Sequence, residues 1–217
     1  MVASQTKISR SSAKMTTARK RSRIEDRPGF DLRTKTAYHE AGHALGYFVF
    51  HVPFDGVSIR REPDSYGRVF QKVPREFRVN DLTPRELDGE IILCLAGPAS
   101  EARLTGRTCW RGGAVDFKEA FDMVAKLEHL HVEDIEPYLR ALWTRANHLF
   151  RRPGHWLGVE RVAAGLLQRE ELTYSEVAAI LQASLEYDFD SWKWRLTPSP
   201  TLACPMLHLM IRRGLRR

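Results

Sequence analysis

The sequence predicts a mainly α-helical domain that carries one small β-hairpin. Apolar residues recur at intervals of three and four in segments between residues 34 and 187, the period of helices buried on one side. Two short runs, 57–61 and 67–73, have the composition of strands and flank the turn-forming stretch EPDSYG. Thr173 precedes Glu176 by three residues, which is the pattern of a helix capping box.

The first predicted helix runs from Thr34 to about Phe50. Its apolar residues fall on one side at helical spacing: Ala37, Ala41, Ala44, Leu45 and Phe48. Pro53 has no backbone N–H to donate and ends this helix before the hairpin begins.

Helices also account for the rest of the predicted domain. The segment 81–106 opens with a helix start signal and carries an apolar face as far as Leu104. The segment 112–130 begins a further helix after a glycine pair. Residues 133–150 and 157–187 are also predicted to be helical, and the stretch RRPGH divides them.

Charge and composition divide the chain into three parts. Residues 1–27 are predicted to be a disordered basic arm, 28–190 a single domain, and 191–217 a proline-containing basic tail. The net charge of +7 lies at the two ends, because residues 1–24 hold seven Lys and Arg and the last six residues hold four, with no acid in either. The remaining chain carries 23 basic and 27 acidic residues, so the overall charge does not indicate a basic face on the domain.

The three cysteines, Cys94, Cys109 and Cys204, are sparse and far apart. This count favours a reducing compartment, predicted to be the cytoplasm, and argues against both a disulfide framework and a cysteine-based zinc site. The acid-free arm has an organellar import address as an alternative use. No apolar run approaches the length of about 18 residues that a membrane span needs.

The stretch HEAGH in the first predicted helix carries a metal-binding pattern. His39 and His43 are four residues apart, which puts both imidazoles on one helix face at a spacing that can hold one metal ion. Glu40 follows the first histidine, where its carboxylate can reach a water on the metal without binding the metal itself. Zinc lowers the pKa of such a water toward about 7, so Glu40 can act as general base in peptide hydrolysis.

The alternative is a pair of histidines on a helix surface, since the bare pattern arises by residue frequency in roughly one to two chains per hundred of this size. The helix is otherwise apolar, so the imidazoles are expected to face the interior, where unpaired polar groups are costly. Gly42 costs about 1 kcal/mol relative to Ala inside a helix, which a closely packed neighbour would explain. Spacing alone does not choose a third ligand among the carboxylates and the six other histidines.

Four segments resemble the peptidase domain of the FtsH family, the ATP-dependent zinc proteases, and they occur in the family's order. AYHEAGHAL resembles the family's zinc helix, and PFDGVSIRREPDSYGRVFQKVPRE resembles the hairpin that follows it. LAGPASEARLTG is similar to a segment written in the family roughly as Gly-Gly-Arg-Ala-Ala-Glu-Glu. GGAVDFKEAFDMV resembles the segment Thr-Gly-Ala-Ser-Asn-Asp-Leu, whose aspartate is the third zinc ligand there. The resemblance covers about residues 34–130.

This resemblance implies a zincin-like helical metallopeptidase fold with Zn²⁺ as its cofactor. It makes His39 and His43 zinc ligands, Glu40 the general base and Asp116 the third ligand.

Asp116 has two competitors for this assignment. Val115 stands where the family has two residues, which makes Asp122 a rival ligand. Position alone favours Asp116 as a helix N-cap.

The predicted function is that of a zinc-dependent endopeptidase acting on a protein or peptide. The sequence has no Gly-x-x-x-x-Gly-Lys-Ser/Thr motif, so an ATPase that unfolds substrates is expected to be a separate partner. One alternative is a catalytically retired peptidase fold that binds or regulates, against which the intact Glu40 argues. Another is a nucleic-acid-associated protein that uses basic residues 1–24.

Overall fold

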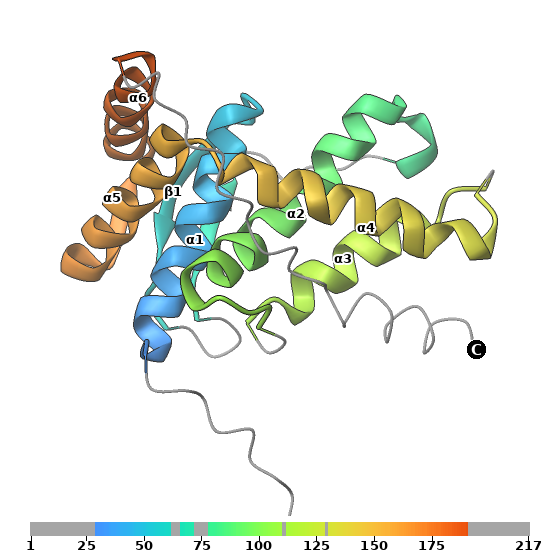
Figure 1. Ribbon diagram of the computed structural model, residues 1–217, viewed down its shortest axis with the longest axis horizontal. Helices are drawn as coiled ribbons and strands as arrows, with labels where there is room; N and C mark the ends of the chain where they lie inside the picture. Colours follow the sequence, from blue (N-terminus) through green and yellow to red (C-terminus); the bar gives the residue numbers. More distant parts are fainter. Residues whose placement is uncertain (1–28, 62–65, 72–77, 110–111, 129, 191–217) are drawn as a thin grey trace, which may run out of the picture.

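The computed structural model describes residues 29–61, 66–71, 78–109, 112–128 and 130–190. These residues form six α-helices and one three-stranded antiparallel sheet (Figure 1). The predicted mainly helical class is therefore confirmed. The basic arm and the C-terminal tail, including Trp192 and Trp194, lie outside the described residues.

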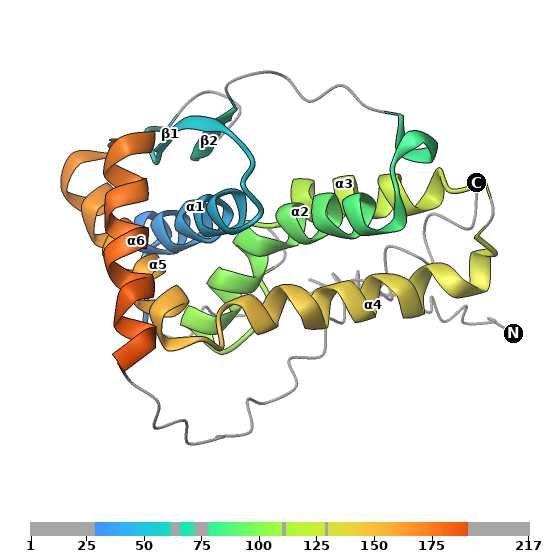
Figure 2. The same ribbon diagram turned by 90° about the horizontal axis from the view of Figure 1, so that it is seen from above.

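The helices are α1 (Leu32–Val49), α2 (Pro84–Thr105), α3 (Ala114–Ala125), α4 (Val132–Leu149), α5 (Pro153–Arg169) and α6 (Tyr174–Asp190). The strands are β1 (Phe54–Ser58), β2 (Arg68–Gln71) and β3 (Glu171–Thr173), and a 3-10 turn, η1 (Val79–Asp81), precedes α2. Figures 1 and 2 show α5 and α6 at the end of the molecule that holds the sheet, whereas α3 and α4 extend away from it.

Helix α1 matches its predicted limits to within two residues at either end. Asp31 caps the helix, because its side chain accepts a hydrogen bond of 2.7 Å from the Thr34 backbone N–H. The alanines of the predicted apolar face and Leu45 are fully buried. This buried face lies against α2 and α5.

Helix α2 packs against α1, α3 and α4. Thr83 and Glu86 form a capping box at its start, in which the Glu86 carboxylate accepts a hydrogen bond of 2.8 Å from the Thr83 N–H. Gly106 follows its end with φ of 73°, a backbone conformation that favours glycine. The predicted segment 81–106 thus corresponds to one helix and its two caps.

The sheet extends the predicted hairpin by one strand. Its order is β2-β1-β3, with β1 in the centre and antiparallel to both neighbours. The first strand begins at Phe54, directly after Pro53, and so lies three residues earlier than the predicted run 57–61. The strand β3 was not predicted, because its three residues are too few to show an alternating pattern.

The same short strand divides the predicted helical segment 157–187 into α5 and α6. Helix α5 ends at Arg169, and Glu170 follows with φ of 66°. Thr173 then ends β3, and its backbone N–H donates a hydrogen bond of 2.8 Å to the Glu176 carboxylate. The capping box predicted from these two residues is confirmed.

No helix in the described part of the chain combines the length and the apolar character that crossing a membrane requires. The apolar stretch 91–99 lies within α2, where all of its residues except Cys94 are buried. The apolar stretch 44–50 forms the end of α1 and its C-cap, and its first three residues are buried.

Gly42 allows α1 and α2 to come close together. A Cβ atom built on Gly42 would lie 2.4 Å from Ser100 Cβ and 2.7 Å from the Ala96 carbonyl oxygen of α2. The Ser100 hydroxyl donates a hydrogen bond of 2.6 Å to the Tyr38 carbonyl oxygen across the same contact. The close-packed neighbour expected from a glycine inside the first helix is thus α2 itself.

Replacing Gly42 by alanine is expected to destabilise the fold by about 1–3 kcal/mol, because the added methyl group cannot fit without moving α2. A fall in Tm of roughly 3–10 °C would follow for a chain of this size. Thermal unfolding followed by circular dichroism measures it. Gly89→Ala on α2 is the control, since a Cβ there would meet only Phe50 at 3.7 Å, an ordinary contact. Equal Tm values for both variants would contradict the close approach.

Candidate metal centre

Helix α1 brings the two histidines of the HEAGH stretch together on its inner side. Their Nε2 atoms lie 3.2 Å apart, and the ring centroids are separated by 4.9 Å. His39 is only 7% exposed, so the histidines are not a pair on the helix surface. Two imidazole nitrogens directed at one point in the interior form two-thirds of a metal-ligand set.

Asp116 in the first turn of α3 brings a third potential ligand to the two imidazoles. Its Oδ2 lies 3.2 Å from His39 Nε2, and its Oδ1 lies 3.1 Å from His43 Nε2. The N-cap of α3 is Gly113, so the alternative role of Asp116 as an N-cap is wrong. The rival Asp122 is partly exposed and pairs with Lys118 on the same helix. His39, His43 and Asp116 thus form a group that can hold a metal ion.

The spacing of these atoms fits a small divalent ion. Bonds of about 2.0–2.1 Å in a tetrahedral zinc site place ligand atoms about 3.3–3.4 Å apart. The two Nε2 atoms are 3.2 Å apart, close to that value, and each lies 3.1–3.2 Å from a different oxygen of Asp116. One ligand atom from each of the three residues lies within 4.8 Å of the others.

Gly97 on α2 keeps the space beside the two imidazoles clear. A Cβ atom at this position would lie 2.3 Å from His43 Nε2 and 2.6 Å from His39 Nε2. Those distances are near metal–ligand bond lengths, so a side chain here would occupy the place of an ion. The donor set and the space beside it therefore fit a bound metal.

Each imidazole has a polar group near the ring nitrogen that faces away from Asp116. His43 Nδ1 lies 2.9 Å from the Leu93 carbonyl oxygen, to which it can donate a proton. His39 Nδ1 lies 3.5 Å from the carboxylate of Glu101 on α2, which is only 3% exposed. The contact of His43 with the Leu93 carbonyl favours the tautomer that leaves Nε2 free to bind a metal. His39 Nδ1 is buried beside the Glu101 carboxylate without a hydrogen bond.

Burial and neighbouring charges act in opposite directions on the pKa values of Asp116 and His39. Burial opposes ionisation of Asp116, but the charges and hydrogen bonds of His43 and His39 hold the pKa of its carboxyl well below the usual range. Burial also disfavours a charged His39, yet Asp116 and Glu101 raise the pKa of its imidazole well above 6.5. A metal ion that binds here would therefore displace a proton from His39.

Glu40 is buried beside this group, with 6% of its surface exposed. Burial raises the pKa of its carboxyl above the usual value, while the nearby charges of His39 and His43 partly offset that rise. The carboxylate is not one of the three ligands.

Two of the residues that complete the site were not assigned from the sequence. Glu101 and Gly97 lie in the stretch LAGPASEARLTG, but their contacts with the histidines cross from α2 to α1. A glutamate within the apolar face of a predicted helix was the available signal for Glu101, because a buried carboxylate needs a partner.

The remaining described histidines do not join the metal centre. His51 and His131 are exposed, and His131 stands at the N-cap of α4. His148 lies in the last turn of α4, and the buried His155 has its Nδ1 atom 2.7 Å from the Leu149 carbonyl oxygen.

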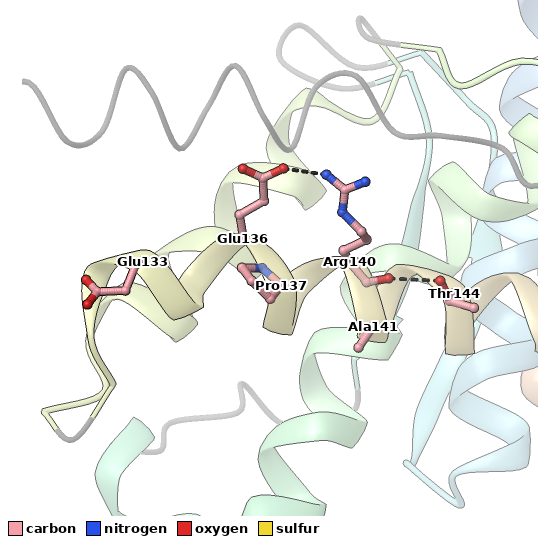
Figure 3. Close-up of a pocket in the computed structure, with 6 residues that line it drawn as sticks. All are labelled: Glu133, Glu136, Pro137, Arg140, Ala141 and Thr144. Atoms are coloured by element: carbon pink, nitrogen blue, oxygen red, sulfur yellow. Dashed lines mark hydrogen bonds and ion pairs between the residues drawn. The ribbon is translucent and has the colours of Figure 1, made fainter.

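An open groove follows one side of α4 at a separate place (Figure 3). It is lined by Glu133, Glu136, Pro137, Arg140, Ala141 and Thr144. Glu136 and Arg140 pair with each other within the helix. The groove contains none of the metal-centre residues.

The chain matches no known family in a comparison with protein families, and a comparison with curated proteins also gives no match. The resemblance to FtsH peptidase domains therefore stays a prediction from the sequence.

Removing Asp116 tests the ligand set directly. We expect about one zinc per wild-type chain and a zinc affinity lower by more than about 100-fold in Asp116→Ala. Removing even a residue that only contacts a metal ligand lowers metal affinity by about 10- to 100-fold, so loss of a ligand should cost more. Metal content and competition with a chromogenic chelator measure this. Asp122→Ala is the matched control on the same helix and should bind like the wild type. If Asp122→Ala lost zinc affinity and Asp116→Ala kept it, Asp122 would be the ligand.

Glu101→Gln tests the outer contact of His39 while keeping the size of the side chain. We expect zinc affinity to fall by about 10- to 100-fold because the imidazole loses its charged partner. Isothermal titration with zinc measures this change, and Glu133→Gln at the exposed start of α4 serves as control. Unchanged affinity in a folded Glu101→Gln variant would contradict an orienting role.

Proposed function

We propose that the chain is a zinc-dependent endopeptidase with a zincin-like fold resembling the peptidase domain of the FtsH family. The observation that carries this proposal is the meeting of three ligand atoms, from His39, His43 and Asp116, beside the buried carboxylate of Glu40. A purely structural metal site would have no need of that fourth group.

The donor set favours zinc. Two imidazole nitrogens and one carboxylate oxygen are the ligand types of catalytic zinc sites, which use three protein ligands and keep the fourth position for water or substrate. The described residues provide three ligands and no fourth. Zinc bound there would polarise the substrate carbonyl and lower the pKa of a water toward about 7.

Glu40 is the residue to which we assign proton transfer. Its carboxylate accepts a proton from the attacking water and returns it to the departing amine nitrogen. Burial raises its pKa and so brings this base nearer to neutral pH, where proton transfer in both directions is efficient. The contact of His43 Nδ1 with the Leu93 carbonyl would orient the His43 imidazole, and the Glu101 carboxylate 3.5 Å from His39 Nδ1 adds a favourable charge beside the His39 imidazole.

The order of the elements also supports the proposal. The four segments that resemble the FtsH peptidase domain correspond to α1, the β1–β2 hairpin, α2 and α3. Helices α1 and α3 carry the ligands, and α2 carries Gly97 and Glu101 beside them.

Flexible peptides and unfolded segments of proteins are the substrates that we propose. These 217 residues contain no P-loop motif, so delivery of folded proteins to the site would need a separate unfoldase.

Glu40→Gln is expected to lower the rate of peptide hydrolysis by about 10²- to 10⁴-fold, because the glutamine side chain cannot accept a proton from the attacking water. Zinc content should stay at the wild-type level, since Glu40 is not a ligand. Cleavage of an unstructured protein such as casein, with fluorescent peptide libraries, measures the activity. Stoichiometric zinc in a wild type that cleaves none of these substrates would favour the alternative of a binding protein with a retired peptidase fold.

A further inference from the structure

Gly67, the residue directly before β2, lies against the side chain of Glu40. A Cβ atom built on Gly67 would be 2.8 Å from both Cγ and Oε1 of Glu40 and 2.9 Å from Cγ2 of Thr36. Cβ atoms in proteins essentially never come this close to other heavy atoms. The backbone of the hairpin therefore reaches the general base only because residue 67 has no side chain.

The conformation of Gly67 does not itself require glycine. Its φ lies outside the left-handed region, and Gly106 is the glycine with positive φ among the described residues. Other residues could adopt this backbone without strain. What excludes them is the space already occupied by Glu40 and Thr36, which lie one turn apart on α1.

The sheet fixes the strand that follows Gly67. Arg68 pairs with Ser58 of β1, and Ser58 pairs on its other side with Glu171 of β3. The strand β1 is thus held from both sides, and it determines where β2 begins over α1. Gly67 is placed by this ladder, and Glu40 is placed by α1, so their contact joins the two elements.

We propose that Gly67 is a positioning residue that holds the Glu40 carboxylate in its working place beside the metal ligands. The catalytic meaning of this contact rests on the proposed function, but the contact itself does not. A side chain at position 67 would push the carboxylate out of its present position, while His39, His43 and Asp116 would keep theirs. The base would then be misplaced in a site that still binds metal.

The first experiment tests the contact through stability in the full-length, zinc-saturated chain. Thr36→Ser serves as the background throughout, because it removes Cγ2 and keeps the hydroxyl that donates to the Leu32 carbonyl. Gly67→Ala is expected to lower Tm there by roughly 3–8 °C, as overpacking does. In the Thr36→Ser/Glu40→Ala background the same change should lower Tm by less than half as much, because the clashing side chain is gone.

The second experiment tests the positioning role through kinetics. In the Thr36→Ser background, Gly67→Ala should lower kcat by about 10- to 100-fold, the size expected for a small misplacement of a catalytic group. KM should change by less than about twofold, and zinc affinity should be unchanged. Gly89→Ala, whose added methyl group meets only ordinary contacts, should leave all three quantities at their reference values.

The outcomes separate this inference from the proposed function. An equal loss of Tm with and without the Glu40 side chain would overturn the contact, as would failure to fold in both backgrounds. A full kcat in a folded Gly67→Ala variant would overturn the positioning role. A wild type without peptidase activity would overturn the proposed function, and the stability measurements would still decide whether Gly67 holds Glu40.

Discussion

The close approach of α1 and α2 is the constraint on which the metal centre depends. Gly42 on α1 and Gly97 on α2 each leave out a side chain that the facing helix has no room for. A Cβ atom on Gly46, one turn further along α1, would meet Leu93 and Ala96 at 3.1 and 3.3 Å, which is tight but less close than at Gly42 or Gly97. Because protein interiors are close-packed and deform little, such a contact fixes the distance between helices. Gly42 lets the helices pack closely, and Gly97 leaves space at the Nε2 atoms, so the packing of this helix pair and the space beside the imidazoles both depend on glycines at one contact.

A second constraint is the balance of charge in this interior. Asp116, Glu101 and Glu40 bring three carboxyl groups close to two imidazoles, and they come from three different helices. Buried ionised groups are costly unless they are paired. The negative charges of Asp116 and Glu101 favour a proton on His39, which is the physical reason for the raised pKa of its imidazole. A divalent cation bound to this group would supply positive charge in place of that proton, and its binding would then favour the folded chain.

Local patterns predicted the helices well, because each depends on residues close in sequence. Asp31 and the alanine face define α1, and the Thr173–Glu176 capping box defines the start of α6. The predictions failed where structure depends on distant partners. The strand β3 is three residues long and exists through its pairing with β1, so no pattern of its own reveals it. Similarly, sequence spacing indicated His39, Glu40 and His43 as candidate site residues. Asp116 was indicated only by the resemblance to a family, and the place of Gly97 beside the histidines became visible only once α2 was seen to face α1.

The pairing of β1 with β3 also sets an order of events during synthesis of the chain. Ser58 pairs with Glu171, so the central strand lacks one of its two neighbours until almost the whole domain has left the ribosome. Contacts between residues so far apart in sequence form late, since the loop between them must close first. The helix that carries His39, Glu40 and His43 is made early, but the sheet beside it cannot be completed until residues 171–173 have been made. A nascent chain therefore holds the chemical groups of the centre before it holds their final arrangement.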